Sequence, residues 1–447
     1  MYQQLHPVTY YFYPLFDTQS AAGTPPAAVQ ERLQAPPAAG VETLLYVHIP
    51  YCHDLCRFCP FHVRVDKGEE VYARYTDALV RELELLAATP RARASDIRAV
   101  YFGGGSPSIF APELLRRIFS TLRSRFALRP DTEISFEGEP KTLGDGARLD
   151  ELKDFGVSRV SFGLQTYDAA LRTHFNINAT LDDVERARRM CREWGFDEIN
   201  VDMMYNLPGQ TIPQLERDIR SLAADGFDSV DYYNLHYYAF SKKFLDQMAS
   251  GEIPPKPSDG VMLSLAEHVR HLLPRLGYAN VADQVYSKRP AVCEYFRLLW
   301  GGGAGRHDAE TLAAGASARG YVDGYCYMNE GSATRYIEAV NEGRLPIDKV
   351  SGRLERPENR GAVFFSKFLA LDKRWVEARE SIPAQTFQSW IDAGYLYDGG
   401  DRWLLSERGK LWTNNITHDA FEPSQLQTAK GSLIKLASKP GVRTGTF

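Results

Sequence analysis

The sequence predicts an α/β fold, namely a partial (β/α)6 barrel of the TIM type followed by a small C-terminal α/β domain of the winged-helix type. Six short runs of β-branched and aromatic residues recur between residues 42 and 300, and amphipathic stretches with helical spacing separate them. A repeated strand-then-helix order implies parallel units with right-handed crossovers, which place functional groups at the C-terminal ends of the strands. From about Ser351 the pattern changes to helices and one short hairpin.

The individual elements follow from local patterns. The predicted strands begin at Leu44, Ile97, Thr132, Ser158, Glu198 and Ser229. The clearest predicted helices are 69–87, 112–126, 181–195 and 213–226, whose apolar residues recur every three to four positions. Further on, GYLYDGGDRWLLS predicts a hairpin with Gly399 and Gly400 at its turn, and a final helix is expected near SERGKLWTNNI.

These elements divide the chain into four expected parts. They are an N-terminal arm with an Ala/Pro-rich linker at 1–41, the barrel at 42–300, a connecting segment at 301–350 and the C-terminal domain at 351–447. The glycine run at 301–305 lacks the strand–helix setting of a dinucleotide-binding fingerprint, so it predicts a tight loop near the barrel mouth.

Composition narrows the class of protein. The 447 residues are 44% hydrophobic and 24% charged, which is typical of an ordered globular chain. Lys and Arg number 52 against 57 Asp and Glu, so the net charge of −5 predicts neither a nucleic-acid partner nor an anionic membrane partner. The N-terminus lacks the basic and apolar regions of a signal peptide, and we expect a cytoplasmic protein. Six unevenly spaced cysteines do not form a secreted disulfide pattern.

Three of the cysteines lie within eight residues, directly after the first predicted strand. Cys52, Cys56 and Cys59 form a C-x3-C-x2-C loop. Three thiolates on one loop can bind three irons of a [4Fe–4S] cluster and leave the fourth iron open to a small molecule. A structural zinc site is the alternative, because His53 or His62 could supply a fourth ligand. The absence of a second C-x-x-C pair favours the cluster.

The loop and its setting resemble the radical S-adenosylmethionine (SAM) superfamily, in its oxygen-independent coproporphyrinogen III oxidase branch. The resemblance extends over most of the chain and is carried by YVHIPYCHDLCRFC, YFGGGSPS, SFEGEP, SFGLQTYD, INVDMMYNLPGQT and LLSERGKLWTNN. It implies that the three cysteines hold a [4Fe–4S] cluster whose open iron binds SAM. One electron then cleaves SAM to methionine and a 5′-deoxyadenosyl radical.

The resemblance also implies a set of SAM contacts. The matching positions are Tyr46, Phe58, Phe61, Gly103, Gly104, Gly105, Ser106, Glu137, Gln165 and Asp202. Glycines allow the backbone to approach a ligand closely. The polar members follow the third, fourth and fifth predicted strands, whose ends converge in a barrel. The alternative for each polar residue is the cap of a following helix.

Two departures from the branch shaped our expectation of function. Phe61 stands where the coproporphyrinogen oxidases carry a further cysteine, and the arginine expected after Gln165 is missing, with Arg172 as a substitute. These departures favour the class C radical SAM methylases and the related cyclopropane-forming enzymes, which bind two SAM molecules. We therefore expect transfer of a methyl or methylene group to an sp2 carbon of a natural-product intermediate, including cyclopropane formation. His236, Tyr233 and Tyr237 are candidate proton acceptors, with aromatic packing as the alternative.

The expected partners follow from this hypothesis. They are an aromatic or unsaturated small-molecule substrate, an electron donor such as flavodoxin or ferredoxin, and a methyltransferase-like protein that completes ring closure. The alternatives are oxidative decarboxylation of coproporphyrinogen III, another radical reaction on a tetrapyrrole or haem, and a non-catalytic haem chaperone.

Overall fold

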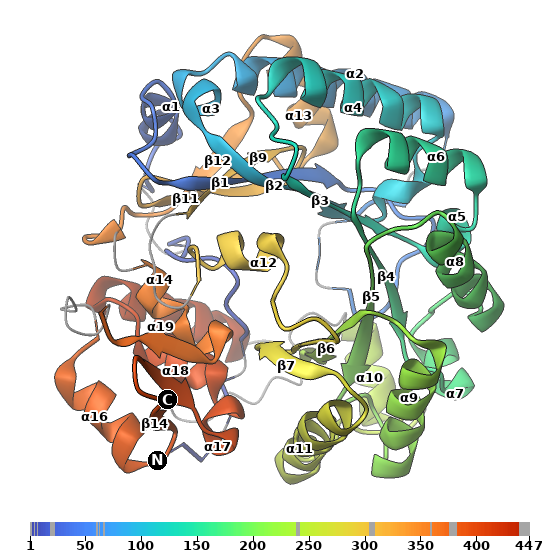
Figure 1. Cartoon of the computed structure of the whole chain (residues 1–447), viewed down its shortest axis with the longest axis vertical. Helices are drawn as coiled ribbons and strands as arrows, with labels where there is room; N and C mark the ends of the chain where they lie inside the picture. Colours follow the sequence, from blue (N-terminus) through green and yellow to red (C-terminus); the bar gives the residue numbers. More distant parts are fainter. Residues whose placement is uncertain are drawn as a thin grey trace.

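The computed structural model describes residues 2–3, 5–6, 8–17, 23–59, 61, 63–65, 68–237, 242–303, 309–357, 360–374 and 382–437. Its main feature is a twelve-stranded sheet in the order β12-β11-β10-β9-β1-β2-β3-β4-β5-β6-β8-β7. The sheet curves around three sides of a ring, and the C-terminal domain fills the remaining gap at the lower left of Figure 1. Among the described residues, no helix combines the length and the apolar character needed to cross a bilayer.

Six parallel strands form the predicted barrel wall. They are β1 (Glu42–Ile49), β2 (Asp96–Gly104), β3 (Glu133–Gly138), β4 (Arg159–Gln165), β5 (Glu198–Tyr205) and β6 (Ser229–Asn234). Each begins within two residues of its predicted start. The predicted fold class is confirmed.

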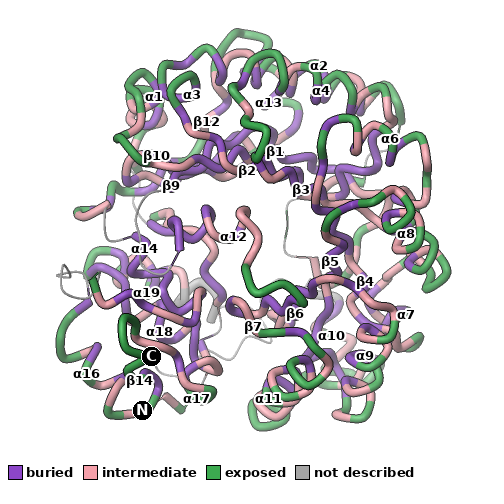
Figure 2. Tube along the Cα trace, in the orientation of Figure 1, coloured by how far each residue is buried: buried purple, intermediate pink, exposed green. Residues whose placement is uncertain are grey.

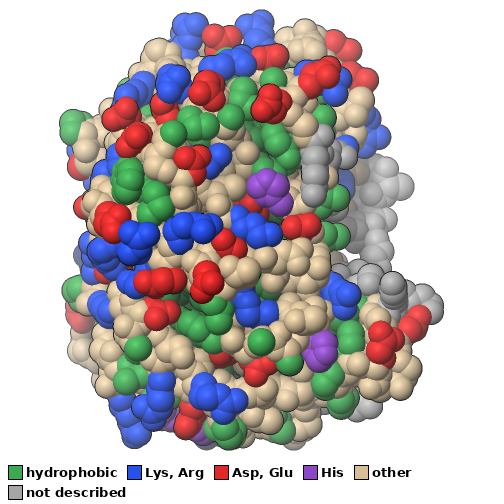
Figure 3. Space-filling model, turned by 90° about the vertical axis from the view of Figure 1, so that its right-hand side faces the viewer, with side chains coloured by type: hydrophobic (Ala, Val, Ile, Leu, Met, Phe, Trp, Pro, Cys, Tyr) green, Lys and Arg blue, Asp and Glu red, His purple; other side chains and the backbone are tan. Residues whose placement is uncertain are grey.

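Helices cover the outside of this wall, as the sequence periodicity predicts. They include α2 (Glu69–Ala87), α3 (Pro90–Ala94), α4 (Pro112–Arg125), α5 (Pro140–Leu143), α6 (Gly146–Phe155), α7 (Ala169–His174), α8 (Leu181–Glu193), α9 (Ile212–Asp225), α10 (Lys242–Ala249) and α11 (Asp259–Arg275). Local sequence fixes their starts, because α8 and α9 both begin with a capping box, Thr180 with Asp183 and Thr211 with Gln214. Figure 2 shows their exposed outer faces and the buried layer beneath. Figure 3 shows basic and acidic side chains intermixed on one outer face.

Residues 301–350, the predicted connecting segment, extend the same sheet. They contain β9 (Ala309–Ala314), β10 (Arg319–Val322), β11 (Tyr325–Asn329), α13 (Ala333–Asn341) and β12 (Ile347–Val350). Strand β9 pairs in parallel with β1 and so continues the barrel wall on its first side. At the other edge, β7 (Ala279–Ala282) and β8 (Val285–Ser287) form a hairpin that pairs antiparallel with β6.

A short helix, α12 (Glu294–Leu299), lies in the middle of the ring (Figure 1). Its first amides, of Glu294 and Tyr295, donate to the Glu133 carboxylate at the start of β3, at 3.0 and 3.4 Å. At its other end Arg297 donates to Glu42 at the start of β1, at 2.6 Å. Because β1 and β3 both begin here, α12 closes the N-terminal end of the barrel as a floor.

The C-terminal domain has its own core and small sheet. It contains α14 (Arg360–Val363), β13 (Ala370–Asp372), α16 (Ala384–Asp392), β14 (Leu396–Asp398), β15 (Arg402–Leu405), α17 (Glu407–Lys410), α18 (Thr413–Asp419) and α19 (Pro423–Ala437). The predicted hairpin is β14–β15, whose turn the Gly399 amide closes by donating to the Arg402 carbonyl oxygen at 2.8 Å. Strand β13 adds a third strand to it.

The N-terminal arm packs between this domain and the barrel, and the linker after it contains α1 (Ala27–Leu33). The Tyr2 ring stacks on Tyr395 with centroids 5.3 Å apart, and its hydroxyl donates to Asp419 at 2.6 Å. Further along the arm, Tyr10 and Tyr13 are buried in the same apolar cluster as the barrel interior. The arm therefore packs against both the C-terminal domain and the interior cluster of the barrel. The exact boundaries of the four expected domains stay a prediction.

Candidate functional site

The cysteine loop leaves β1 at the C-terminal end of the barrel and is held on two sides. The Cys52 amide donates to the Arg64 carbonyl oxygen at 2.9 Å, on the returning part of the loop. On the other side, the Arg57 amide donates to the Phe175 carbonyl oxygen at 3.0 Å, and Asn176 donates to the Leu55 carbonyl oxygen at 2.9 Å. The segment after β4 and α7 therefore fixes the loop beside the barrel mouth.

The three thiols suit a cluster that spreads its ligands over several irons. They are partly buried, and burial raises the pKa of Cys52 to about 12 and that of Cys56 to about 11. Such thiols become thiolates when a metal offsets the cost of burying their charge. Among the described residues no group of three His, Cys, Asp or Glu side chains is gathered for a single metal ion. A [4Fe–4S] cluster does not need such a group, because each thiolate binds a different iron.

The alternative zinc site gains no support from the nearby histidines. The His53 ring nitrogen Nδ1 contacts the Glu139 carboxylate, which lies after β3. His62 lies outside the described residues. The donor set therefore fits the cluster better than a closed zinc site.

The glycine turn after β2 sits directly beside the cysteine loop. The Gly105 amide donates to the Ile49 carbonyl oxygen at 2.8 Å, and the Ser106 amide donates to that of Tyr51 at 2.7 Å. A Cβ atom on Gly105 would come within 2.5 Å of the Tyr51 oxygen, so a larger residue cannot fit. The Ser106 hydroxyl lies 3.8 Å from the Cys52 sulfur. Chain packing alone requires this glycine, and the contact of the turn with SAM stays a prediction.

Glu137, at the end of β3, faces this turn. One carboxylate oxygen accepts the Tyr101 hydroxyl at 2.5 Å, and the other accepts the Gly104 amide at 3.2 Å. Burial raises the pKa of Glu137 above its ordinary value, whereas both hydrogen bonds lower it. These two hydrogen bonds fix the carboxylate at the barrel mouth, beside the glycine turn that packs against the start of the cysteine loop.

Asp202 on β5 lies within electrostatic reach of Glu137. Its carboxylate accepts the Asn200 side-chain amide at 3.3 Å. Burial, together with the nearby Asp231 and Glu137 carboxylates, raises the pKa of Asp202 well above its ordinary value. Gln165 ends β4 with a left-handed φ of 69°, at a shift in the β4–β5 register. The structure thus brings Glu137 and Asp202 together, and a bend in the chain places Gln165 at the neighbouring strand end.

Beneath these carboxylates lies a buried polar layer. Arg159 donates to Glu198 at 2.9 Å and lies 3.7 Å from Asp231. Asn200 also donates to Asp231, at 3.1 Å. Burial raises the pKa of Asp231 to about 6, although Arg159 lowers it. The Arg159 guanidinium therefore neutralises more than one carboxylate and holds this layer together. Because burial raises the pKa of Asp231, the layer also carries less negative charge than its composition suggests.

Tyrosine rings line the interior between the floor and the mouth. Tyr101 stacks on Tyr295 of α12 with ring centroids 3.6 Å apart, and on Tyr46 with centroids 6.1 Å apart. The Tyr46 hydroxyl lies 3.0 Å from His48 Nδ1. Sequence reasoning found Tyr46 but missed Tyr101 and Tyr295. The alternation of inward-facing residues along the second strand could have indicated Tyr101, two residues before Gly103.

The three candidate proton acceptors have different surroundings. Tyr233, on β6, lies near Asp202, Tyr295 and the arm residue Tyr11, and burial raises its pKa. His236 Nε2 lies 2.8 Å from the Thr9 hydroxyl. Tyr237 is buried, and its hydroxyl donates to the Asn206 carbonyl oxygen at 2.7 Å. Only Tyr233 therefore joins the group around Asp202, and a catalytic role for any of the three stays a prediction.

The two phenylalanines of the cysteine loop have different surroundings. Phe58 packs edge-on against Phe175 with centroids 5.9 Å apart. Phe61 is 65% exposed, which places its ring toward solvent. Their predicted role beside SAM remains a prediction.

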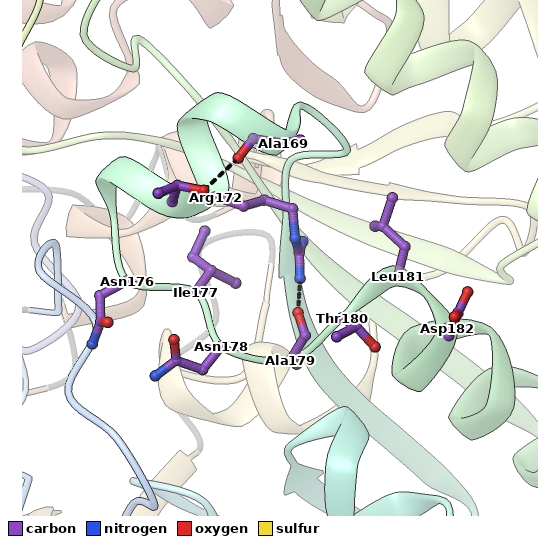
Figure 4. Close-up of a pocket in the computed structure, with 10 residues that line it drawn as sticks. Ala169, Arg172, Asn176, Ile177, Asn178, Ala179, Thr180, Leu181 and Asp182 are labelled. Atoms are coloured by element: carbon purple, nitrogen blue, oxygen red, sulfur yellow. Dashed lines mark hydrogen bonds between the residues drawn. The ribbon is translucent and has the colours of Figure 1, made fainter.

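Arg172 supports the backbone. Its guanidinium donates to the carbonyl oxygens of Leu164, at 2.7 Å, and Thr166, at 2.9 Å, and also contacts that of Ala179. Figure 4 shows it spanning a pocket of about 560 Å³ between α7 and α8. We infer that Arg172 braces the β4–α7 connection.

Known proteins match this chain in sequence and in structure. The model of the Radical SAM superfamily matches residues 46–222. Anaerobilin synthase from Escherichia coli O157:H7 is 28% identical over 86% of this chain and 85% of its own length. Heme chaperone HemW from E. coli K12 is 24% identical over 83% and 96%. An oxygen-independent coproporphyrinogen III oxidase from Bradyrhizobium diazoefficiens is 27% identical over 70% of both chains.

The solved structure of coproporphyrinogen III oxidase from E. coli has a TM-score of 0.73 and 21% identity, over 89% of this chain and 93% of that one. It shows the same fold.

These findings correct one expectation. The prediction of a class C methylase or cyclopropane-forming enzyme is wrong, because the relatives that match most of the chain are named for haem, coproporphyrinogen and anaerobilin. The replacement of a cysteine by Phe61, on which the prediction depended, is a single exposed position and does not define a class. The radical SAM superfamily uses a [4Fe–4S] cluster and SAM. Residues 46–222 match the radical SAM superfamily, and most of the chain is similar to the coproporphyrinogen oxidase branch of that superfamily.

Proposed function

We propose that this protein is a radical SAM enzyme that acts on a tetrapyrrole. One observation carries the proposal: the carboxylates of Glu137 and Asp202 stand at the mouth of a barrel whose interior is lined by stacked tyrosine rings. Flat tyrosine faces suit a ligand built from aromatic rings, such as the pyrroles of a tetrapyrrole. The names of two relatives point the same way, since haem and coproporphyrinogen are both tetrapyrroles.

We assign separate roles to the cysteines, to Glu137 and to the elements that cover the barrel. Cys52, Cys56 and Cys59 would hold a [4Fe–4S] cluster, which in its reduced form would supply the electron that cleaves SAM to a 5′-deoxyadenosyl radical. The Glu137 carboxylate, held by Tyr101 and Gly104, is fixed for hydrogen bonds from a ligand at the mouth. Helix α12 closes the floor, and the Thr9 hydroxyl of the arm lies 2.8 Å from His236 Nε2 just after β6, so both ends of the interior are partly covered, which would limit access of water to a reactive radical.

The test is anaerobic reconstitution with iron and sulfide, reduction, and incubation with SAM and either haem or coproporphyrinogen III. We expect 5′-deoxyadenosine to form faster with one of these tetrapyrroles than without it, together with loss of that tetrapyrrole. Release of 5′-deoxyadenosine without any change in either tetrapyrrole would reject the substrate class.

A haem chaperone is the second candidate, supported by the HemW relatives. A protein with that role binds haem but yields no product from it. Stoichiometric haem binding with no 5′-deoxyadenosine above background would therefore favour the chaperone.

A further inference from the structure

Thr9 of the N-terminal arm joins the barrel to the C-terminal domain through its side chain. Its hydroxyl oxygen lies 2.8 Å from His236 Nε2, just after β6, and it accepts the Asn414 side-chain amide at 3.1 Å. Asn414 is on α18 of the C-terminal domain. Thr9 is buried, and among the described residues these two side chains are the partners of its hydroxyl. The hydroxyl therefore depends on them for its hydrogen bonds.

The same chain of hydrogen bonds continues into the C-terminal domain. Lys367, in the short 3-10 helix Phe365–Phe368, is fully buried and donates to Asn414 Oδ1 at 2.9 Å. It also donates to the Asp283 carboxylate, between β7 and β8, at 2.7 Å. The Asp283 amide in turn donates to the Lys367 carbonyl oxygen at 2.7 Å. Asp283 thus anchors the far end of the chain and keeps Lys367 charged by pairing with it.

The charge of Lys367 sets the direction of every later bond in this chain. An ammonium group donates and cannot accept, so Asn414 must turn its carbonyl oxygen toward Lys367. The Asn414 NH2 group then faces Thr9, whose oxygen accepts. The Thr9 hydroxyl proton is left for its other partner, His236 Nε2. That nitrogen can accept the proton of Thr9 only if it carries no proton itself.

The opposite arrangement is less favourable. If His236 carried a proton on Nε2, it would donate to the Thr9 oxygen, which already accepts from Asn414. The Thr9 hydroxyl proton would then have no acceptor among the described residues. A buried donor without an acceptor costs free energy, which favours the arrangement in which Nε2 accepts.

We propose that Thr9, Asn414 and Lys367 are positioning residues for His236. They hold its imidazole neutral, with the proton on Nδ1 and with Nε2 as an acceptor. His236 follows the C-terminal end of β6, so its ring belongs to the barrel mouth, yet the arm and the C-terminal domain determine which of its nitrogens carries the proton. Nε2 is then unavailable as the proton acceptor for a reactant. This consequence for catalysis rests on the proposed function, whereas the tautomer itself does not depend on any substrate.

Nuclear magnetic resonance of the full-length protein with ¹⁵N-labelled histidine tests the tautomer directly. The ¹⁵N chemical shift of an imidazole nitrogen shows whether that nitrogen carries a proton, and a His236→Gln sample identifies the signals of His236. The spectra are recorded without SAM or tetrapyrrole at about pH 8, where an unperturbed imidazole is neutral. We expect unprotonated Nε2 to exceed protonated Nε2 by about tenfold in the wild type.

Three substitutions separate positioning from a general effect on folding. Thr9→Val keeps the shape of the side chain but removes the hydroxyl, so most of the tenfold preference should be lost, whereas Thr9→Ser should retain it. In Asn414→Asp the new carboxylate accepts from both Lys367 and Thr9, so the Thr9 oxygen should accept from His236 and Nε2 should become protonated. Thr121→Val, which removes a hydroxyl that donates to a backbone oxygen within α4, is the control and should leave the spectrum of His236 unchanged.

A protonated Nε2 in the wild type would overturn the inference, as would Thr9→Val with an unchanged preference. Thermal melting shows which variants are folded. If Asn414→Asp is folded and its Nε2 stays unprotonated, the proposed direction of the chain is wrong, and if it does not fold, Thr9→Val and Thr9→Ser still decide. A wild type that leaves tetrapyrroles unchanged would count against the proposed function and would not affect this measurement.

Discussion

The Tyr101 hydroxyl donates a 2.5 Å hydrogen bond to Glu137, and this pair joins the aromatic interior to the predicted SAM contacts. Tyr101 also stacks on Tyr295 of the floor helix, so the position of Glu137 depends on a segment about 160 residues later in the chain. The predicted ligand site and the floor of the barrel are therefore one connected structure.

Removing the negative charge of Glu137 tests its predicted contact with SAM. We expect Glu137→Gln to weaken SAM binding by about tenfold, because a carboxylate accepts stronger hydrogen bonds than an amide. SAM titration of the reconstituted protein measures this, with Glu113→Gln, in the first turn of α4, as the control. An unchanged affinity for SAM would show that Glu137 does not contact SAM.

The cysteine assignment predicts iron content. Cys56→Ala removes one of three cluster ligands, and we expect iron and sulfide content to fall well below four each per chain after reconstitution. Cys191→Ala is the matched control, since Cys191 is buried between α8 and the sheet, far from the loop in sequence. Four irons bound by the Cys56 variant would show that other ligands hold the cluster.

Substitution of Tyr233, on β6, and of Tyr237, just after it, should have different effects. Tyr237→Phe removes a hydroxyl that donates to the Asn206 carbonyl oxygen, so it should cost about 1 kcal/mol of stability without changing the yield of 5′-deoxyadenosine. Tyr233→Phe removes a hydroxyl near Asp202, and we expect it to slow tetrapyrrole turnover with little loss of stability. Urea unfolding and product analysis measure both effects. The reverse pattern would place the proton acceptor at Tyr237.

Glu82 gives the protein a pH-dependent stability. Its carboxylate lies buried on α2 and accepts hydrogen bonds from Tyr336 at 2.5 Å, Gly315 at 2.6 Å and Asn329 at 2.7 Å. Burial nevertheless raises its pKa to about 7 from 4.5. The folded state thus holds this proton more tightly than the unfolded state. Its contribution to stability is full below pH 4.5 and falls by about 3 kcal/mol as the pH rises through 7.

Glu82→Gln carries no titrating proton at this position. We therefore expect the difference in unfolding free energy between wild type and variant to change between pH 5 and pH 7.5, in favour of the variant at the higher pH. Urea unfolding at both values measures it, and the other titrating groups cancel in the difference. A constant difference would show that Glu82 does not titrate in this range.

The buried ion pair between Lys367 and Asp283 should also contribute to the stability of the fold. Lys367 is fully buried and also donates to Asn414 at 2.9 Å. Lys367→Met leaves the Asp283 charge buried alone, so it should cost about 3 to 5 kcal/mol of unfolding free energy. The double variant Lys367→Met/Asp283→Leu should recover part of that loss in urea unfolding. Equal stability of the single and double variants would argue against strong coupling.

Local patterns were enough to predict the six wall strands and their helices. Strands buried on both faces appear as runs of β-branched and aromatic residues, and helices buried on one face show a 3.6-residue repeat. The cysteine loop and Glu137 were found through motifs at strand ends. The floor was not found. Helix α12 has only six residues, and Glu133, which caps it, is remote in sequence. Strands β9 to β12 were missed because they are short and follow a glycine run rather than a β/α repeat.

The docking of residues 2–17 has a consequence for the order of events during synthesis. Tyr2 finds its partner Asp419 across 417 positions of sequence, and His6 pairs with Asn415 across 409. Since chains fold as they leave the ribosome, the barrel wall can form before Asp419 and Asn415 have been synthesised. The arm must wait, unattached, until nearly all of the described chain has emerged. Docking of the arm between the barrel and the C-terminal domain is then the last step in completing this fold.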